Sequence, residues 1–219
     1  MDTERPYIVM ISSSVNGYED QLLQIESMFN SLGYWVVMSM SGTMKVNPHL
    51  HNFDNCLKAV EGCDVFFGII RPDCGTGRAG DECVTFKEFK HARKLNKPCW
   101  YVIDNKIKIY KNLLKTLTLR EFPDTKDENL NAAITSYYDR QIRGRKHLPR
   151  VLDFFESKDF RQFDPQCFDM EDFVNHKGMA REEVTNNWMQ YCNNLLEIAK
   201  FIRTNFEDKS FIDSIIKES

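Results

Sequence analysis

The sequence predicts an α/β protein in which helices cover both faces of a parallel sheet. Short apolar runs alternate with helically spaced apolar segments four times within roughly the first hundred residues, which is typical of repeated strand–helix units. The run Val65–Ile70 is apolar throughout, as expected of a strand covered on both faces. Polar loops follow the apolar runs, and in such sheets ligands bind beyond the carboxyl ends of the strands.

Four strands are expected in this first part of the chain, in the sheet order 2-1-3-4 with right-handed crossovers. Their apolar and aromatic composition favours the ranges Tyr7–Ile11, Tyr34–Met40 (with Val36–Met40 in the sheet), Val65–Ile70 and Cys99–Ile103.

Three helices connect these strands. The first is expected over Tyr18–Leu32, where Gly33 provides a C-terminal cap. The second runs through Phe53–Val60 and stops at Gly62. The third contains Glu88 and ends before Lys97-Pro98, because proline disfavours a helical residue before it.

The second part of the sequence is more helical. We expect residues 1–104 to form an α/β core and residues 105–219 to form a helical extension packed on it as one unit. Helical spacing is present over Tyr110–Leu117 and, most clearly, over Val184–Ile202. Residues 160–163 are expected to add a short fifth strand at an edge of the sheet.

Charge and cysteine usage restrict the class of protein. The chain has 29 basic and 32 acidic residues, a net charge of −3, which argues against a nucleic-acid partner. It has seven cysteines and no C-x-x-C pair, so we expect free thiols and a cytoplasmic location. The acidic N-terminus is not expected to be a signal peptide, and no apolar run is long enough to span a membrane.

The helix around Glu88 is the most informative stretch of the sequence. Asp81, Thr85 and Glu88 are spaced i, i+4, i+7 and share one side of this helix, next to an apolar stripe that begins at Phe89. Glu88 is therefore expected at the rim of a cleft, where a carboxylate can stabilise the oxocarbenium centre of a breaking glycosidic bond. The alternative is a solvated surface glutamate, which is the usual role of this residue on a helix.

The turn after the first strand contains candidate substrate-binding residues. Ser12, Ser13 and Ser14 are followed by Asn16-Gly17, and their polar groups can bind a phosphate or a ribose near the start of the next helix. The same serines can instead cap that helix. We expect the turn as a whole, with Gly17, to contact the ligand.

Arg71 and Asp73 directly follow the third strand. Arg71 can bind a diphosphate in bidentate fashion. The alternative is an ion pair of Arg71 with Asp73 or Asp81 that holds the loop. The loops Ser12–Gly17, Ser41–Leu50 and Arg71–Gly80 are expected to converge on one cleft.

Several known chemistries find no support in the sequence. The five histidines are scattered and form no H-E-x-x-H motif, so we expect no metal site. The first strand is not followed by G-x-G-x-x-G, and neither a nucleophile elbow nor a P-loop is present. We therefore expect no bound cofactor.

The chain resembles a large bacterial group of TIR-like (Toll/interleukin-1 receptor-like) domains that is catalogued as a domain of unknown function. The residues that carry the resemblance lie in the segments Ile8–Ser14, Asp64–Ile70, Gly75–Gly80, Val84–Phe89, Val102–Asp104 and Val151–Phe163 through to Trp188. The resemblance implies a flavodoxin- or TIR-like sheet. In TIR NAD hydrolases, a helix glutamate supports loss of nicotinamide.

The helix of Glu88 is also similar to that of the nucleoside 2-deoxyribosyltransferases. Asp81, Thr85, Glu88, Ala92 and Lys97-Pro98 match that pattern, and Val84 departs from it because the family has glycine there. In those enzymes the glutamate attacks the anomeric carbon. Both resemblances imply that Glu88 acts at an N-glycosidic bond.

The expected function is cleavage of an N-glycosidic bond, with the nicotinamide–ribose bond of NAD as first choice and antiphage defence as the setting. NAD is then a substrate, and no cofactor is needed. Two alternatives stay open: a non-catalytic module that senses a nucleotide or self-assembles, and a deoxyribosyltransferase. A small nucleotide is the expected ligand, a homo-oligomer or a partner effector protein is the expected assembly, and nucleic acid and membrane are not expected partners.

Overall fold

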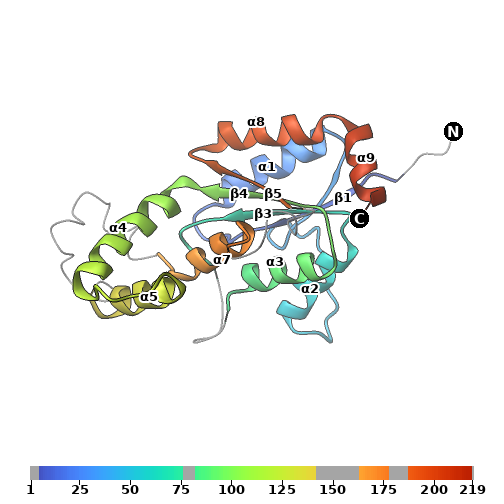
Figure 1. The fold of residues 1–219 in the computed structure, drawn as a ribbon. Helices are drawn as coiled ribbons and strands as arrows, with labels where there is room; N and C mark the ends of the chain where they lie inside the picture. Colours follow the sequence, from blue (N-terminus) through green and yellow to red (C-terminus); the bar gives the residue numbers. More distant parts are fainter. Residues whose placement is uncertain (1–4, 76–81, 142–162, 178–186, 219) are drawn as a thin grey trace.

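The computed structural model describes residues 5–75, 82–141, 163–177 and 187–218. Its centre is a five-stranded parallel sheet in the order β2-β1-β3-β4-β5 (Figure 1). The strands are β1 (Ile8–Ser12), β2 (Trp35–Val37), β3 (Val65–Ile70), β4 (Cys99–Asp104) and β5 (Asn187–Cys192).

Helices cover both faces of this sheet (Figure 1). On one face lie α1 (Glu19–Ser31), α8 (Leu195–Phe206) and α9 (Lys209–Glu218). On the other lie α2 (Asn52–Gly62), α3 (Val84–Lys94) and α7 (Gln166–Val174). The helices α4 (Asn105–Glu121) and α5 (Leu130–Gln141), joined through the short η1 (Asp127–Asn129), extend beyond the end of the sheet.

The predicted α/β class, the parallel sheet and the order of its first four strands are confirmed. The second strand is shorter than predicted and ends at Val37. The chain leaves the sheet at the next residue because the backbone N–H of Met38 donates to the hydroxyl of Thr43, 3.0 Å away, and closes a loop. Val65–Ile70 is buried at every position, as its continuous apolar sequence predicts.

The prediction of a helix across Asn187–Cys192 was wrong. β5 is Asn187–Cys192, which pairs with β4, whereas a helix was expected across this segment. The tryptophan and tyrosine are three residues apart, which is a helical spacing, but the exposure alternates with the period of two that marks an edge strand. The helix begins only at Leu195, after Asn194 caps it by accepting from the N–H of Glu197 at 3.0 Å. Of the predicted strand 160–163, residues 160–162 lie outside the described residues, and Phe163 is not in a strand.

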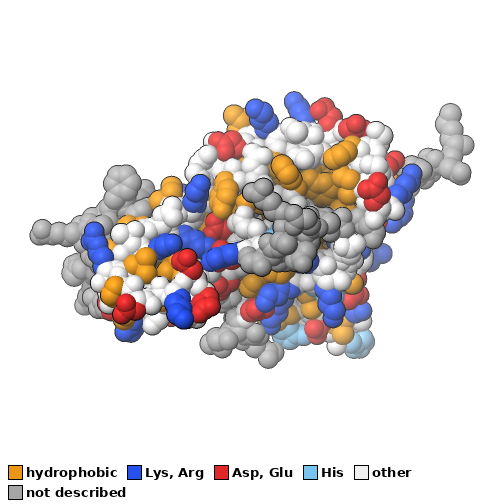
Figure 2. Space-filling model, viewed as in Figure 1, with side chains coloured by type: hydrophobic (Ala, Val, Ile, Leu, Met, Phe, Trp, Pro, Cys, Tyr) orange, Lys and Arg blue, Asp and Glu red, His pale blue; other side chains and the backbone are white. Residues whose placement is uncertain are grey.

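Charged side chains of both signs are mixed over one face of the molecule (Figure 2). Figure 2 shows that Lys and Arg alternate with Asp and Glu over the visible face, in keeping with the small net charge of −3. Within the described ranges, no helix combines the length and the apolar character that crossing a membrane requires.

The centre of the sheet is closely packed around Gly68 of β3. A β-carbon at this position would lie 2.6 Å from the Phe89 ring of α3 and 2.6 Å from the Tyr101 ring of β4. These two rings pack on each other at 4.9 Å between centroids. Glycine at this position therefore lets α3, and with it Glu88, approach the sheet closely.

We predict that Gly68→Ala destabilises the protein by about 1–3 kcal/mol, because two buried rings must move to admit one methyl group. Urea denaturation followed by circular dichroism measures this loss. Gly62→Ala is the matched control, because a β-carbon there meets nothing within 4 Å. Equal stability of the two variants would contradict the close packing.

Candidate functional site

Glu88 lies in the middle of α3 and points into the protein. Helix α3 begins at Val84, and Thr85, Phe86, Glu88, Phe89 and Ala92 form its buried side. The residue Glu88 is only 6% exposed. It therefore lies deeper than the cleft rim at which the sequence placed it, because the polar positions of the helix turn toward the sheet together with the apolar stripe.

Two hydrogen bonds hold the Glu88 carboxylate. The hydroxyl of Ser12 donates to its Oε2, and the thiol of Cys56 forms a second side-chain hydrogen bond with it. Ser12 is the last residue of β1 and Cys56 lies on α2. The site thus joins the end of a strand to two helices on the same face of the sheet.

Burial changes the proton affinity of this group. Loss of solvent raises the pKa of Glu88 from 4.5 to about 7, and the hydrogen bonds from Ser12 and Cys56 oppose part of that rise. The same burial, together with the nearby carboxylate, raises the pKa of Cys56 to about 12, so its thiol keeps its proton. At neutral pH both forms of Glu88 are populated, as required of a general acid or base.

A cavity of about 500 Å³ opens onto Glu88 at the carboxyl end of β1. Candidate residues Ser12, Ser13, Ser14, Thr85 and Glu88 all line it. The other described lining residues come from β1 and the turn after it, from α1, α2 and the start of α3, and from the loops after β2 and β3: Met10, Ile11, Val15, Asn16, Glu19, Leu22, Met38, Ser39, Asn52, Phe53, Cys56, Gly75 and Val84.

The loop after β3 closes on the turn after β1 at this cavity. The hydroxyl of Ser14 donates to the carbonyl of Asp73 at 2.6 Å. The carboxylate of Asp73 accepts from the N–H of Gly75 at 2.8 Å. Gly75 has φ +84°, and a β-carbon there would lie 3.1 Å from that of Ser14, so glycine is required for this approach. Asp73 therefore shapes the cavity wall.

Arg71 holds the turn after β1 rather than pairing with Asp73. Its Nη1 donates to the carbonyls of Ser14 and Asn16 at 3.1 and 3.2 Å, and its guanidinium lies 4.4 Å from the centre of the Tyr18 ring. Among the described residues it forms no ion pair with Asp73, so that alternative was wrong. Its other proposed partner, Asp81, lies outside the described residues.

Gly17 forms the corner of the same turn. Its φ of +69° is one that glycine adopts without strain, and its N–H donates to Glu19 at 3.2 Å. Neither Gly17 nor Arg71 is among the described residues that line the cavity. Substrate contact by these two residues stays a prediction.

Sequence reasoning missed the contribution of α2. Cys56 contacts Glu88 only because α2 and α3 pack side by side, and no local pattern in the sequence indicates that neighbour. The predicted convergence of three loops was also only partly right. In the loop Ser41–Leu50, the residues Thr43, Lys45, Val46 and Asn47 line a separate cavity on another face of α2.

No metal centre accompanies the site within the part of the chain that the structure describes, where no three His, Cys, Asp or Glu side chains are placed to share an ion. All seven cysteines are buried and free. The thiols of Cys74 and Cys83 lie 2.9 Å apart, which is longer than the roughly 2.05 Å of a disulfide bond.

The raised pKa of Glu88 predicts a pH-dependent stability. Between pH 4.5 and about 7 the folded protein keeps this proton and the unfolded chain has lost it, so wild-type stability falls as the pH rises. The full shift corresponds to about 3 kcal/mol. Because Glu88→Gln cannot ionise, its stability relative to wild type should increase by that amount between pH 4.5 and 8.

Urea denaturation at several pH values measures this difference. Glu61→Gln is the matched control, because that exposed carboxylate on α2 should change stability little. Parallel pH profiles of wild type and Glu88→Gln would contradict a desolvated carboxylate.

Comparison with known proteins gives a family for the chain. The family described as "Domain of unknown function (DUF4062)" matches residues 8–162. No curated protein and no solved structure matches the chain. The matched range covers more than half of the sequence and includes β1, β3, α3 and Glu88. The chain therefore belongs to the DUF4062 family, a family of domains of unknown function.

Proposed function

We propose that this protein is a TIR-like enzyme that cleaves an N-glycosidic bond, with the nicotinamide–ribose bond of NAD as its first substrate. The observation that carries the proposal is the buried Glu88 carboxylate, with a pKa of about 7, at the inner end of a cavity beyond the sheet. A preorganised carboxylate in a site poor in water stabilises positive charge far better than one in bulk solvent.

The charge of the cavity supports a cationic reacting group. Its described lining residues include two carboxylates, Glu19 and Glu88, and no Lys, Arg or His. The pyridinium of a nicotinamide nucleotide is positive before the bond breaks, and the ribosyl group becomes positive as it breaks. This favours nicotinamide nucleosides and nucleotides over neutral nucleosides.

Each residue has a definite part in the proposed step. The bond between the anomeric carbon and the nicotinamide nitrogen breaks, and nicotinamide leaves with the electron pair. The ionised Glu88 stabilises the ribosyl cation, while Ser12 and Cys56 fix the orientation of the carboxylate. Ser13, Ser14 and Thr85 provide hydroxyls for the ribose. Water, or a second nucleophile where water is excluded, then completes hydrolysis, cyclisation or transfer.

A second candidate function has its own supporting observation. Glu88 is 6% exposed and already hydrogen-bonded to Ser12 and Cys56, so these two groups occupy positions that an attacking carboxylate would need. This favours a module that binds a nucleotide, or self-assembles around it, without turnover. The deoxyribosyltransferase alternative requires direct attack by Glu88 and is the less supported of the two catalytic options.

The experiment is incubation of the purified protein with NAD, NADP, nicotinamide riboside and purine nucleosides, followed by chromatography of the products. We predict release of nicotinamide by wild type and a loss of about a hundredfold or more in Glu88→Gln, because the variant cannot oppose the cation. Glu61→Gln should keep full activity. Nicotinamide riboside tests whether the cationic ring alone is recognised without a diphosphate.

The pH dependence of kcat/KM provides a second readout. Because the ionised form of Glu88 acts, kcat/KM should rise with pH through about 7 and then level off. Absence of turnover with every substrate, also at high protein concentration, would overturn the enzymatic proposal. Calorimetric binding of NAD without turnover would then support the sensing module.

A further inference from the structure

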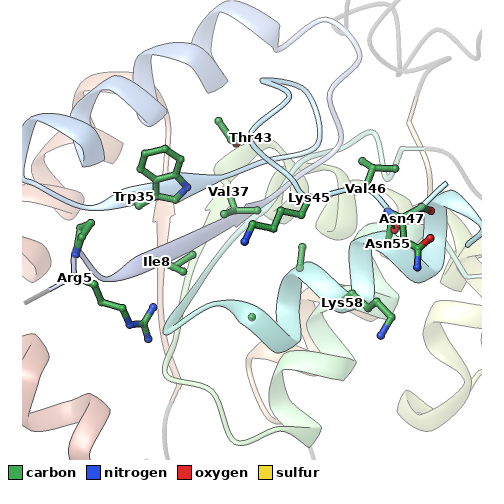
Figure 3. Close-up of a pocket in the computed structure, with 13 residues that line it drawn as sticks. Arg5, Ile8, Trp35, Val37, Thr43, Lys45, Val46, Asn47, Asn55 and Lys58 are labelled. Atoms are coloured by element: carbon green, nitrogen blue, oxygen red, sulfur yellow. Dashed lines mark hydrogen bonds between the residues drawn. The ribbon is translucent and has the colours of Figure 1, made fainter. Parts of the chain in front are cut away.

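A second cavity, of about 680 Å³, lies between the edge strand β2 and α2 (Figure 3). Helix α2 packs on β1 and leaves this face of the edge strand β2 uncovered, so a cavity remains between β2 and α2. Trp35 and Val37 are two residues apart, so they point to the same face, and Trp35 pairs with Ile8 of β1. All three side chains line the cavity, and Trp35 is 55% exposed.

The far wall of this cavity is the loop that contains Thr43, Lys45, Val46 and Asn47. Two side chains fix this loop in place. Thr43 accepts from the N–H of Met38 at 3.0 Å. Asn55, which is 1% exposed, accepts from the N–H of Asn47 at 2.8 Å and donates to its carbonyl at 3.2 Å. The cavity is therefore largely preformed, which lowers the ordering cost of binding.

Positive charge surrounds the apolar floor. Arg5, Lys45 and Lys58 line the cavity, and its described lining residues include no carboxylate. Arg5 is paired with Asp64 at 2.9 Å, whereas Lys45 and Lys58 form no ion pair with any described residue. Figure 3 shows the Lys45 side chain extended toward Val37 and Ile8, with Lys58 farther along α2. This charge is local, because the whole chain is slightly acidic.

We propose that this cavity binds a small organic anion with a flat, apolar body. The body would pack on Trp35, Ile8 and Val37, and its carboxylate, sulfonate or phosphate would meet the ammonium group of Lys45. The volume lies in the range of small-molecule sites, which combine a mostly apolar lining with a few polar groups. The exposed Trp35 supplies the broad apolar contact that such a ligand needs.

This site is distinct from the Glu88 cavity. Asn55, Lys58, Ala59 and Gly62 of α2 line the anion cavity, whereas Cys56 on another face of the same helix bonds to Glu88. The proposal therefore requires no catalysis, and a binding experiment tests it whatever the outcome of the activity assay.

The test uses 2-naphthoate as probe and 2-naphthamide as its neutral match, with the full chain in isothermal titration calorimetry. We expect one naphthoate per chain and about fivefold weaker binding of the amide, as loss of one exposed charge pair implies. Lys45→Gln should weaken naphthoate binding by a similar factor and amide binding not at all. Trp35→Ala should weaken both probes, and raised salt should weaken only naphthoate.

Lys217→Gln, on an exposed residue of α9, is the matched control and should bind both probes as wild type does. Amide-proton NMR shifts of wild type should change in β2, in the loop 43–47 and in α2, which locates the probe without any variant. Equal affinity for the two probes, or shifts elsewhere, would overturn the proposal. So would a dimer that Trp35→Ala dissociates, or binding of acidic peptides without binding of naphthoate.

Discussion

Keeping one carboxylate away from water is the constraint around which this face of the sheet is arranged. A buried carboxylate is costly unless it receives hydrogen bonds or keeps its proton, and Glu88 does both in part. The hydrogen-bond donors to Glu88 come from the end of β1 and from α2. The pKa of Glu88 therefore depends on how these two elements are positioned relative to α3. Gly68 contributes from the other side, because its missing side chain lets α3 lie close to the sheet.

Burying Glu88 lowers the free energy of unfolding at neutral and alkaline pH. A group whose pKa rises on folding is least favourable to the folded state once both states have lost the proton. A purely structural position would be filled more favourably by a neutral residue of similar shape. Perturbed carboxylates in cavities are therefore functional candidates.

The sequence predicts the buried central strands better than it predicts the edge strand β5 and the start of α8. A continuous apolar run such as Val65–Ile70 is typical of a strand that is covered on both faces, and the alternation of such runs with helical segments predicts a parallel sheet. The helix prediction failed at β5 because Trp188 and Tyr191 are three residues apart, a helical spacing, whereas in the strand they lie on opposite faces. The overlooked signal was Asn194, three residues before Glu197, which marks the true start of α8.

In the site, too, residues marked by a local sequence pattern could be predicted, and residues that depend on tertiary packing could not. Glu88, Ser12, Ser14 and Thr85, which line one cavity, could be selected as candidates because each lies at a recognisable point of a strand–loop–helix unit. The spacing along α3 did not show that Glu88 points inward, since that depends on how closely the helix approaches the sheet. Cys56 could not be found at all, because its role depends on the packing of α2 against α3.

Helix α2 stands between two cavities whose described linings carry opposite charge. One contains Glu19 and Glu88 without a cation, and the other contains Lys45 and Lys58 without a carboxylate. A ligand that combines a cationic ring with anionic phosphates would meet carboxylates and neutral hydroxyl groups, but no cationic side chain, among the described residues of the Glu88 cavity. Under the function proposed above, the carboxylates of this cavity would act on the reacting end of a nicotinamide nucleotide, and its diphosphate would depend on neutral donors. Nicotinamide riboside and NAD share the same glycosidic bond, but only NAD contains a diphosphate. A comparison of their cleavage rates therefore separates recognition of the cationic ring from recognition of the phosphates.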